Sequence, residues 1–225
     1  NQGKAKAMSS QWNSDKIRQA MRLYAVTDRA WLGGRCLEQC VSDAIDGGAT
    51  FIQLREKDAP HDEVLGLARS LKNLCARRGV PFVIDDDVSL AHEVGADGVH
   101  VGQSDMACAH ARELLGPEAI VGVSANTVQQ ALEAQAAGAD YLGVGAVIPT
   151  DTKPDADFVS FEELKAICAA VSIPVVAIGG LNAGTLDCLR GSGVDGAAVV
   201  SAIFAADDCE AAARELRDKL EEVLP

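Results

Sequence analysis

From residue 21 onward, short apolar runs alternate with longer segments whose apolar residues recur at helical spacing. Most of the runs are rich in β-branched residues, as is typical of buried parallel strands. They comprise residues 23–26, 51–54, 81–84, 98–101, 120–123, 141–144, 175–178 and 196–200. Segments between them, such as 63–77 and 127–137, predict helices. A strand followed by a helix, repeated about eight times, predicts a parallel sheet with helical crossovers.

A recurring five-residue unit indicates that this sheet closes into a barrel. Residues 95–99, 138–142 and 193–197 are variants of Gly-Ala-Asp-Gly-Val, and residues 48–52 are a weaker copy. In each unit a glycine is placed to end a helix in the left-handed conformation before a strand begins. Such recurrence predicts stacked strand–helix pairs, and hence a (β/α)8 TIM barrel. The alternative is an open doubly wound sheet, but no Gly-x-Gly-x-x-Gly motif follows the first run.

We expect residues 21–225 to form a single TIM-barrel catalytic domain, preceded by an N-terminal extension of residues 1–20. The extension is polar and has no strand pattern, although Trp12 is a candidate to dock on the barrel. Met8 is a candidate natural start, which would make residues 1–7 part of a tag.

Composition and charge narrow the classes of function. The net charge of −13 disfavours nucleic acid and anionic membranes as partners. No apolar stretch approaches the roughly 20 residues of a membrane helix, and the N-terminus has no apolar signal core. The 7 cysteines have no histidine at ligand spacing, so we expect free thiols in the cytoplasm or another reducing compartment, such as a plastid stroma. With only 4% aromatic residues, the core should consist of Ala, Val, Ile and Leu.

Candidate chemistry should lie at the carboxyl ends of the strands, where such barrels place their active sites. Gly179 and Gly180 follow the seventh run and allow the backbone to approach a ligand closely. Ser201 begins a short helical segment, residues 201–204, whose N–H groups attract anions. Loops seven and eight form the common phosphate site of these barrels, so we expect a phosphorylated ligand there; the alternative is two ordinary loops.

Acidic residues end two neighbouring strands and suggest a metal. Asp86 and Asp105 would face each other, and paired carboxylates need a proton or a cation between them. Oxygen ligands without His or Cys favour Mg²⁺ over zinc. The alternative is that Asp86 and Asp87 only cap the following helix, which we favour for Asp87 alone.

Basic residues converge on the same rim. Arg55 and Lys57 alternate in phase after the second run, and Lys153 approaches from the long loop after the sixth. Three cations beside a magnesium site can neutralise a diphosphate. A serine hydrolase is disfavoured because no Gly-x-Ser-x-Gly motif is present, and a Schiff-base aldolase because no lysine lies in a predicted strand. His100 lies within the fourth run, where a barrel-lining role is expected.

These motifs resemble the thiamine-phosphate synthase (thiamine-phosphate pyrophosphorylase) family. The matching segments occur in the family's order and comprise residues 53–57, 83–90, 98–105, 122–127, 143–153, 175–180 and 199–203. The resemblance implies a transferase of thiamine biosynthesis with Mg²⁺ as cofactor. The implied reaction condenses 4-amino-2-methyl-5-hydroxymethylpyrimidine diphosphate with 4-methyl-5-(2-phosphooxyethyl)thiazole, giving thiamine phosphate and pyrophosphate.

The resemblance also implies roles for residues of this chain. Asp86 and Asp105 would hold Mg²⁺, and Arg55, Lys57 and Lys153 would contact the diphosphate. Gln53 and Ser124 would lie by the pyrimidine, with Ser124 and the three cations as the catalytic set. The thiazole phosphate would be held by Thr150, Thr152, Gly180, Val200 and Ser201.

Four residues depart from the family pattern. Asp85 replaces a usual Asn that helps to bind the diphosphate, and a carboxylate there would repel that group unless it is protonated or turned toward Mg²⁺. Asn126 replaces a frequent His, and Ala146 and Ile148 replace residues that are often aromatic or Pro. The last three changes shape the pocket without altering its charge.

Two rival functions remain. A thiazole tautomerase-like isomerase would lack the diphosphate cations and use a His where Asn126 stands. A non-catalytic phosphate-binding barrel is suggested only by Asp85. We expect small-molecule partners, neither nucleic acid nor membrane, and leave assembly into a homo-oligomer open.

Overall fold

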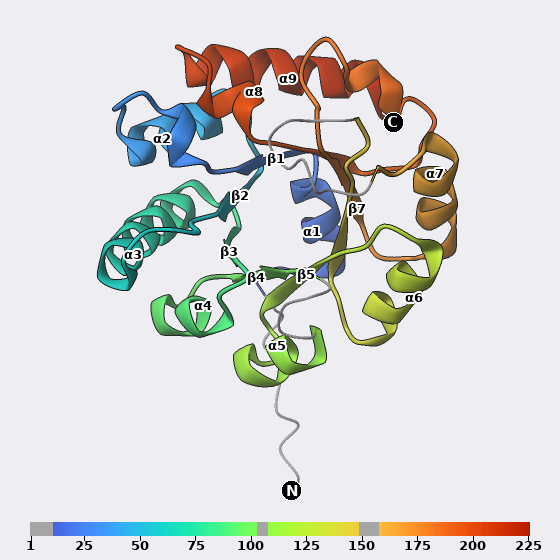
Figure 1. Ribbon diagram of the computed structural model, residues 1–225, viewed down its shortest axis with the longest axis horizontal. Coiled ribbons are helices and arrows are strands. Elements are labelled where there is room, and N and C mark those ends of the chain that lie inside the picture. Colours follow the sequence, from blue (N-terminus) through green and yellow to red (C-terminus); the bar gives the residue numbers. More distant parts are fainter. Residues whose placement is uncertain (1–10, 103–107, 149–157) are drawn as a thin grey trace, which may run out of the picture.

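Eight parallel strands form a closed barrel in the computed structural model, which describes residues 11–102, 108–148 and 158–225. Each strand pairs with its sequence neighbour, and β1 pairs with β8 to close the ring. The strands are β1 Leu23–Val26, β2 Phe51–Leu54, β3 Phe82–Asp85, β4 Gly98–Val101, β5 Ile120–Ser124, β6 Tyr141–Val144, β7 Val175–Ile178 and β8 Gly196–Val199. Figure 1 looks down the ring of strands. The predicted (β/α)8 TIM barrel is confirmed, and the open doubly wound sheet is excluded.

Helices surround the strands (Figure 1). They are α2 Leu37–Asp46, α3 His61–Arg78, α4 Val88–Val94, α5 Cys108–Leu115, α6 Val128–Ala136, α7 Phe161–Ala170 and α9 Cys209–Val223, with the short α8 Ser201–Phe204 and the 3-10 turns η1 Arg29–Trp31 and η2 Leu186–Leu189. The crossover between β7 and β8 departs from the expected pattern, because this glycine-interrupted segment forms only η2. Within the described ranges, none of the helices combines the length and apolar character needed to cross a membrane.

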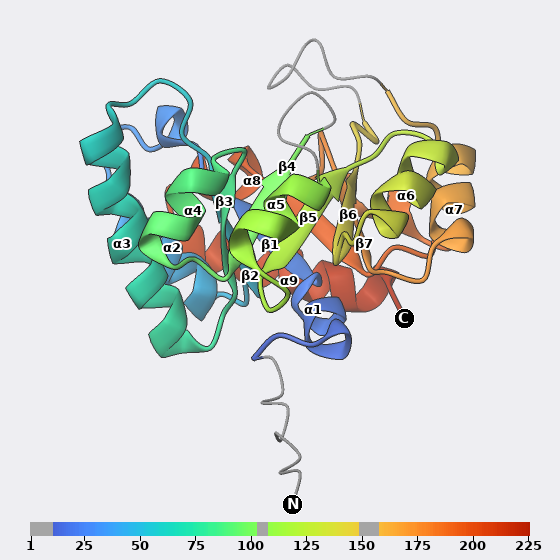
Figure 2. The ribbon, with the colours of Figure 1, turned by 90° about the horizontal axis from the view of Figure 1, so that it is seen from below.

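The segment before the first strand also contributes to the barrel. Helix α1 (Ser14–Ala20) lies across the end of the barrel where the strands begin, as Figure 2 shows. Its Ile17 and the following Met21 are buried against residues of the barrel interior. Trp12 docks as its position suggested, with its indole Nε1–H donating to Asp97 Oδ1 at 2.9 Å. The segment before β1 therefore contributes Ile17 and Ala20 to the core of the barrel.

The recurring five-residue units fasten the beginnings of the strands. In each unit the third residue, an Asp or Thr, accepts a hydrogen bond from the backbone N–H near the start of the preceding strand. The pairs are Thr50 Oγ1 with Leu23 N (2.9 Å), Asp97 Oδ2 with Phe82 N (2.9 Å), Asp140 Oδ2 with Val121 N (2.7 Å) and Asp195 Oδ2 with Val175 N (2.9 Å). The repeat therefore has a structural role at the end of the barrel opposite the rim.

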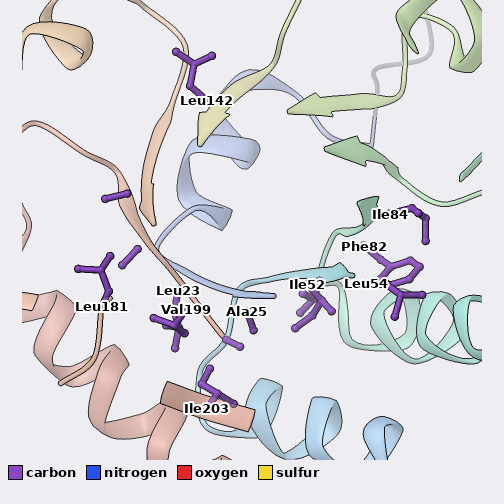
Figure 3. Packing of buried hydrophobic residues seen from close by; sticks show 14 of the residues in the cluster. Leu23, Ala25, Ile52, Leu54, Phe82, Ile84, Leu142, Leu181, Val199 and Ile203 are labelled. Atoms are coloured by element: carbon purple, nitrogen blue, oxygen red, sulfur yellow. The ribbon is translucent and has the colours of Figure 1, made fainter. Parts of the chain in front are cut away.

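The hydrophobic core has two parts with different composition. The larger part lies mostly between strands and helices and is largely aliphatic, as expected; Figure 3 shows Leu54 and Ile84 there, although Phe82 joins them. The smaller part fills the barrel interior and contains Tyr24, Phe51 and Tyr141. Tyr24 stacks on Phe51 with ring centroids 4.4 Å apart. The expected aromatic-free core is therefore wrong for the interior, where both tyrosines of the chain are concentrated.

Candidate active site

Acidic and basic side chains meet where β2 and β3 end. These strands are neighbours, with Gln53 in register with Val83, so the residues that follow them share one edge of the rim. Lys57 Nζ lies 3.1 Å from Asp85 Oδ2 and also contacts Asp86 Oδ2. Arg55 Nε lies 3.7 Å from the same Asp85 oxygen. The structure thus brings four of the predicted site residues into one cluster.

Asp86 has an unusual backbone. Its φ of +62° is the one positive value among the non-glycine residues that the structure describes. Such a conformation costs on the order of 1–3 kcal/mol, although Asp tolerates it better than most residues, and it recurs at functional sites. The Asp86 N–H donates to the carbonyl oxygen of His100 at 2.8 Å, which ties the end of β3 to β4. The next residue has a different role, because Asp87 Oδ1 caps α4 by accepting from Leu90 N at 2.8 Å, as predicted.

Asp85 is paired with cations. Its side chain is only 11% exposed and lies between Lys57 and Arg55. Partial burial lowers the pKa of the Lys57 ammonium, but hydrogen bonds and charge from Asp86 and Asp85 outweigh it, so the net pKa is raised. Lys57 is therefore a cation at neutral pH, and the Asp85 carboxylate is directed toward positive charge.

The Arg55 guanidinium has a hydrogen-bond donor that the described residues do not satisfy. Among the described residues, no acceptor lies within hydrogen-bond reach of its buried Nε. Its Nη1 is 4.0 Å from Asp28 Oδ2, which is too long for a hydrogen bond. A buried, unsatisfied guanidinium N–H is costly, so an anionic ligand at this position would be favoured.

Sequence reasoning missed residues that orient the loop after β2. Thr27 is fully buried and accepts the Arg55 N–H at 3.1 Å. Glu56, between the two cations in sequence, pairs instead with Arg29 Nε at 2.9 Å. No motif marks these residues, because their contacts join β1 to the loop after β2. Together they leave Arg55 and Lys57 directed at the same carboxylate.

A chain of hydrogen bonds crosses the barrel interior below the rim. Gln53 Nε2 donates to Tyr24 Oη at 2.7 Å, and Tyr24 and Tyr141 hydroxyls lie 2.7 Å apart. Tyr141 Oη is 3.0 Å from His100 Nδ1, and His100 Nε2 is 2.9 Å from Ser124 Oγ. Gln53 and Ser124, both predicted to lie by one ligand, are thus joined. The barrel-lining role expected for His100 is confirmed, while both tyrosines were missed.

The predicted phosphate loops lie side by side. Gly180 has a φ of +70°, and a Cβ there would lie 2.7 Å from Ile148 Cβ. Ile148 N–H donates to Gly179 O at 3.2 Å, so the glycine pair lets the loop after β6 approach the end of β7. On the neighbouring β8, Ser201 begins α8 after Val200, and no side-chain hydrogen bond caps this helix. Its first N–H groups are therefore suited to receive an anion.

Part of the predicted site lies outside the described residues. Asp105, Thr150, Thr152 and Lys153 belong to residues 103–107 and 149–157. Among the residues that are described, no group of three or more His, Cys, Asp or Glu is placed to hold a metal ion. The assignment of Mg²⁺ to Asp86 and Asp105 stays a prediction.

Known proteins share both the sequence and the fold. A family model described as thiamine monophosphate synthase matches residues 23–203. The chain is 50% identical over 198 residues to a thiamine-phosphate synthase of Chloroflexus aurantiacus, covering 87% of this chain and 91% of that one. It is 45% identical over 194 residues to the Clostridium tetani enzyme, covering 86% and 93%. The solved thiamine phosphate pyrophosphorylase from Pyrococcus furiosus superposes with a TM-score of 0.85 at 42% identity, over 93% of this chain and all of that one.

The closed barrel and its clustered cations define a (β/α)8 barrel that carries a charged site at the carboxyl ends of its strands. More distant barrels, such as a 3-hexulose-6-phosphate synthase at 21% identity and a TM-score of 0.64, share the fold alone. The family match is specific: the chain belongs to the thiamine-phosphate synthase family. It is accordingly a transferase of thiamine biosynthesis.

Proposed function

We propose that the rim around Arg55 and Lys57 binds the diphosphate of 4-amino-2-methyl-5-hydroxymethylpyrimidine diphosphate and stabilises it as it leaves. The observation that carries this proposal is the cluster in which both cations face Asp85 while Arg55 Nε has no described acceptor. A diphosphate would satisfy that donor and share both charges. The acceptor substrate is the thiazole phosphate, and the products are thiamine phosphate and pyrophosphate.

The chemistry needs charge stabilisation more than proton transfer. The bond between the pyrimidine methylene carbon and the diphosphate oxygen breaks, and the thiazole nitrogen forms a new bond to that carbon. The aminopyrimidine ring can delocalise positive charge, so the main demand is to stabilise the departing anion. Fixed cations at a partly buried rim do this electrostatically. No general base is required, because the attacking nitrogen carries no proton.

The donor set at the end of β3 fits a hard divalent cation. Asp85 and Asp86 both direct a carboxylate oxygen at the Lys57 ammonium, so this position already favours positive charge. Asp86, together with Asp105, would hold Mg²⁺ through oxygen ligands. When bound, Mg²⁺ supplies further positive charge to the diphosphate. Asp85 then lies beside these cations and offsets part of the positive charge that they offer to the diphosphate.

The other substrate groups are assigned to the remaining rim. Gln53 and Ser124 would contact the pyrimidine, since the hydrogen-bonded chain holds both at the mouth of the interior. Gly180, Val200 and Ser201 would receive the thiazole phosphate beside the uncapped start of α8, together with Thr150 and Thr152. Lys153 would join Arg55 and Lys57 at the diphosphate. Two anionic groups would thus occupy separate parts of one rim.

Pyrophosphate release from the two substrates with Mg²⁺ tests the proposal. Release that requires both substrates, stops with a chelator and resumes with added Mg²⁺ supports it. Conversion of a thiazole without pyrophosphate release would instead indicate an isomerase, and binding without turnover a non-catalytic barrel. Comparing Mg²⁺ with Zn²⁺ in the rescue checks the preference for a hard cation.

A further inference from the structure

The hydrogen-bonded chain in the interior is built into the packing of the barrel. A Cβ at Gly122 of β5 would lie 2.1 Å from Tyr141 Cζ, and one at Gly143 of β6 would lie 3.0 Å from His100 Cε1. These two strand glycines therefore leave room for the rings of Tyr141 and His100. Tyr24 and Tyr141 are almost completely buried, with exposed fractions of 1% and 0%. The positions of their hydroxyls are consequently fixed by packing.

One direction of hydrogen bonding along this chain gives every hydroxyl proton an acceptor. The Gln53 amide nitrogen can only donate, so Tyr24 Oη accepts from it. Between the two tyrosine hydroxyls either can donate, but only if Tyr24 donates does its buried proton find an acceptor within the chain, at Tyr141 Oη. In that order Tyr141 donates its proton to His100 Nδ1. An accepting Nδ1 places the proton of a neutral imidazole on Nε2, which donates to Ser124 Oγ. Burial raises the pKa of both tyrosines well above the ordinary value, so their hydroxyls keep their protons.

We propose that Tyr141 is a positioning residue for the pyrimidine end of the site. Through Tyr24 its hydroxyl fixes the orientation of the Gln53 amide, and through Nδ1 it holds His100 as the Nε2–H tautomer toward Ser124. The Tyr141 hydroxyl thereby fixes the orientation of the hydrogen-bonding groups at both positions, Gln53 and Ser124, that are assigned to the pyrimidine. This inference rests on the proposed function for its kinetic consequence, but its structural claim is independent of catalysis.

Tyr141→Phe tests the inference because it removes the hydroxyl and keeps the ring. We expect ¹⁵N–¹H correlation spectra of the wild-type chain to show His100 as a single Nε2–H tautomer, and those of Tyr141→Phe to show a mixture. Spectra of His100→Gln identify the signal among the four histidines of the chain. With the thiazole phosphate saturating, we expect the KM for the pyrimidine diphosphate to rise roughly tenfold, the equivalent of one orienting hydrogen bond. The KM for the thiazole phosphate should not change.

Tyr24→Phe provides a matched control. It breaks the link to Gln53 but leaves His100 Nδ1 as the remaining acceptor in the chain for the Tyr141 proton, so it should raise the same KM without altering the tautomer. Thermal unfolding of both variants shows whether any loss of activity comes from unfolding. An Nδ1–H tautomer in the wild-type chain would refute the proposed direction. An unchanged tautomer and KM in Tyr141→Phe would show that Tyr141 only packs. Absence of turnover in the wild-type chain would count against the proposed function and leave the tautomer result standing.

Discussion

Replacing Asp85 by Asn isolates the effect of one extra carboxylate at the rim. The Asp85 oxygen lies 3.1 Å from Lys57 Nζ and 3.7 Å from Arg55 Nε. With an effective dielectric constant of about 20, these separations correspond to gross attractions of about 5 and about 4.5 kcal/mol. Because the Lys57 side chain is 42% exposed and also contacts Asp86, solvent screening and pairing leave a net contribution of about 1–2 kcal/mol.

That net attraction has opposite consequences for folding and for binding. Without substrate, Asp85→Asn should lower the free energy of unfolding by about 1–2 kcal/mol, which for a chain of this size lowers the Tm by about 2–8 °C. The released cations should bind a diphosphate more tightly, by up to roughly tenfold in KM for the pyrimidine diphosphate. We expect kcat to stay the same or increase.

Three measurements on Asp85→Asn check this reasoning, namely thermal unfolding, steady-state pyrophosphate release and calorimetric binding of inorganic pyrophosphate with Mg²⁺. Asp87→Asn is the matched control, since it removes the same charge two residues further along the chain, at the cap of α4, where Asn also caps well. It should leave pyrophosphate affinity unchanged. A loss of tenfold or more in kcat for Asp85→Asn, with a raised Mg²⁺ requirement, would show that Asp85 is a metal ligand and that the electrostatic account is wrong.

Other substitutions test the remaining parts of the rim. Lys57→Ala should lower kcat by roughly 10²-fold because a fixed cation at the departing group is lost. Lys165→Ala, on the exposed outer face of α7, should leave kcat unchanged. Equal activity in the two variants would show that Lys57 is not part of the site. Lys153→Ala should also lower kcat by roughly 10²-fold, and wild-type turnover would dismiss its assigned role. Gly180 has a φ of +70° and an added Cβ would meet Ile148, so Gly180→Ala should cost about 1–3 kcal/mol of stability. The substitution should raise the KM for the thiazole phosphate but not the KM for the pyrimidine diphosphate. An equal increase in both KM values would argue against a separate phosphate subsite.

The strands were predictable because burial on both faces gives a continuous apolar signal. Most strand bounds match, and β3 differs for a physical reason. Pro81 has no N–H to donate to the sheet, so the strand begins at Phe82, and at its other end Asp85 still pairs with His100. The alternation of strands and helices predicted a full helix before β8, but only the 3-10 turn η2 forms there.

The charged part of the site was predictable from its place after the strands. Arg55, Lys57, Asp85 and Asp86 follow two successive strands, and a parallel barrel brings such residues together. Contacts between side chains across the barrel interior could not be predicted from positions in the sequence. Tyr24 and Tyr141 are 117 residues apart, and their hydrogen bond depends on which side chains face inward at matching heights. The space left by Gly122 is visible only in three dimensions.

The placement of α1 has a consequence for handling this protein. The helix covers the end of the barrel where the strands start, and the completely buried Met21 that follows it belongs to the same buried cluster as the two tyrosines. Trimming the chain to its first strand would open the interior to water from that side. Water could then compete for each hydroxyl and amide in the lumen, so a truncated protein that still folds would be expected to lose selectivity at a rim that the deletion never touched.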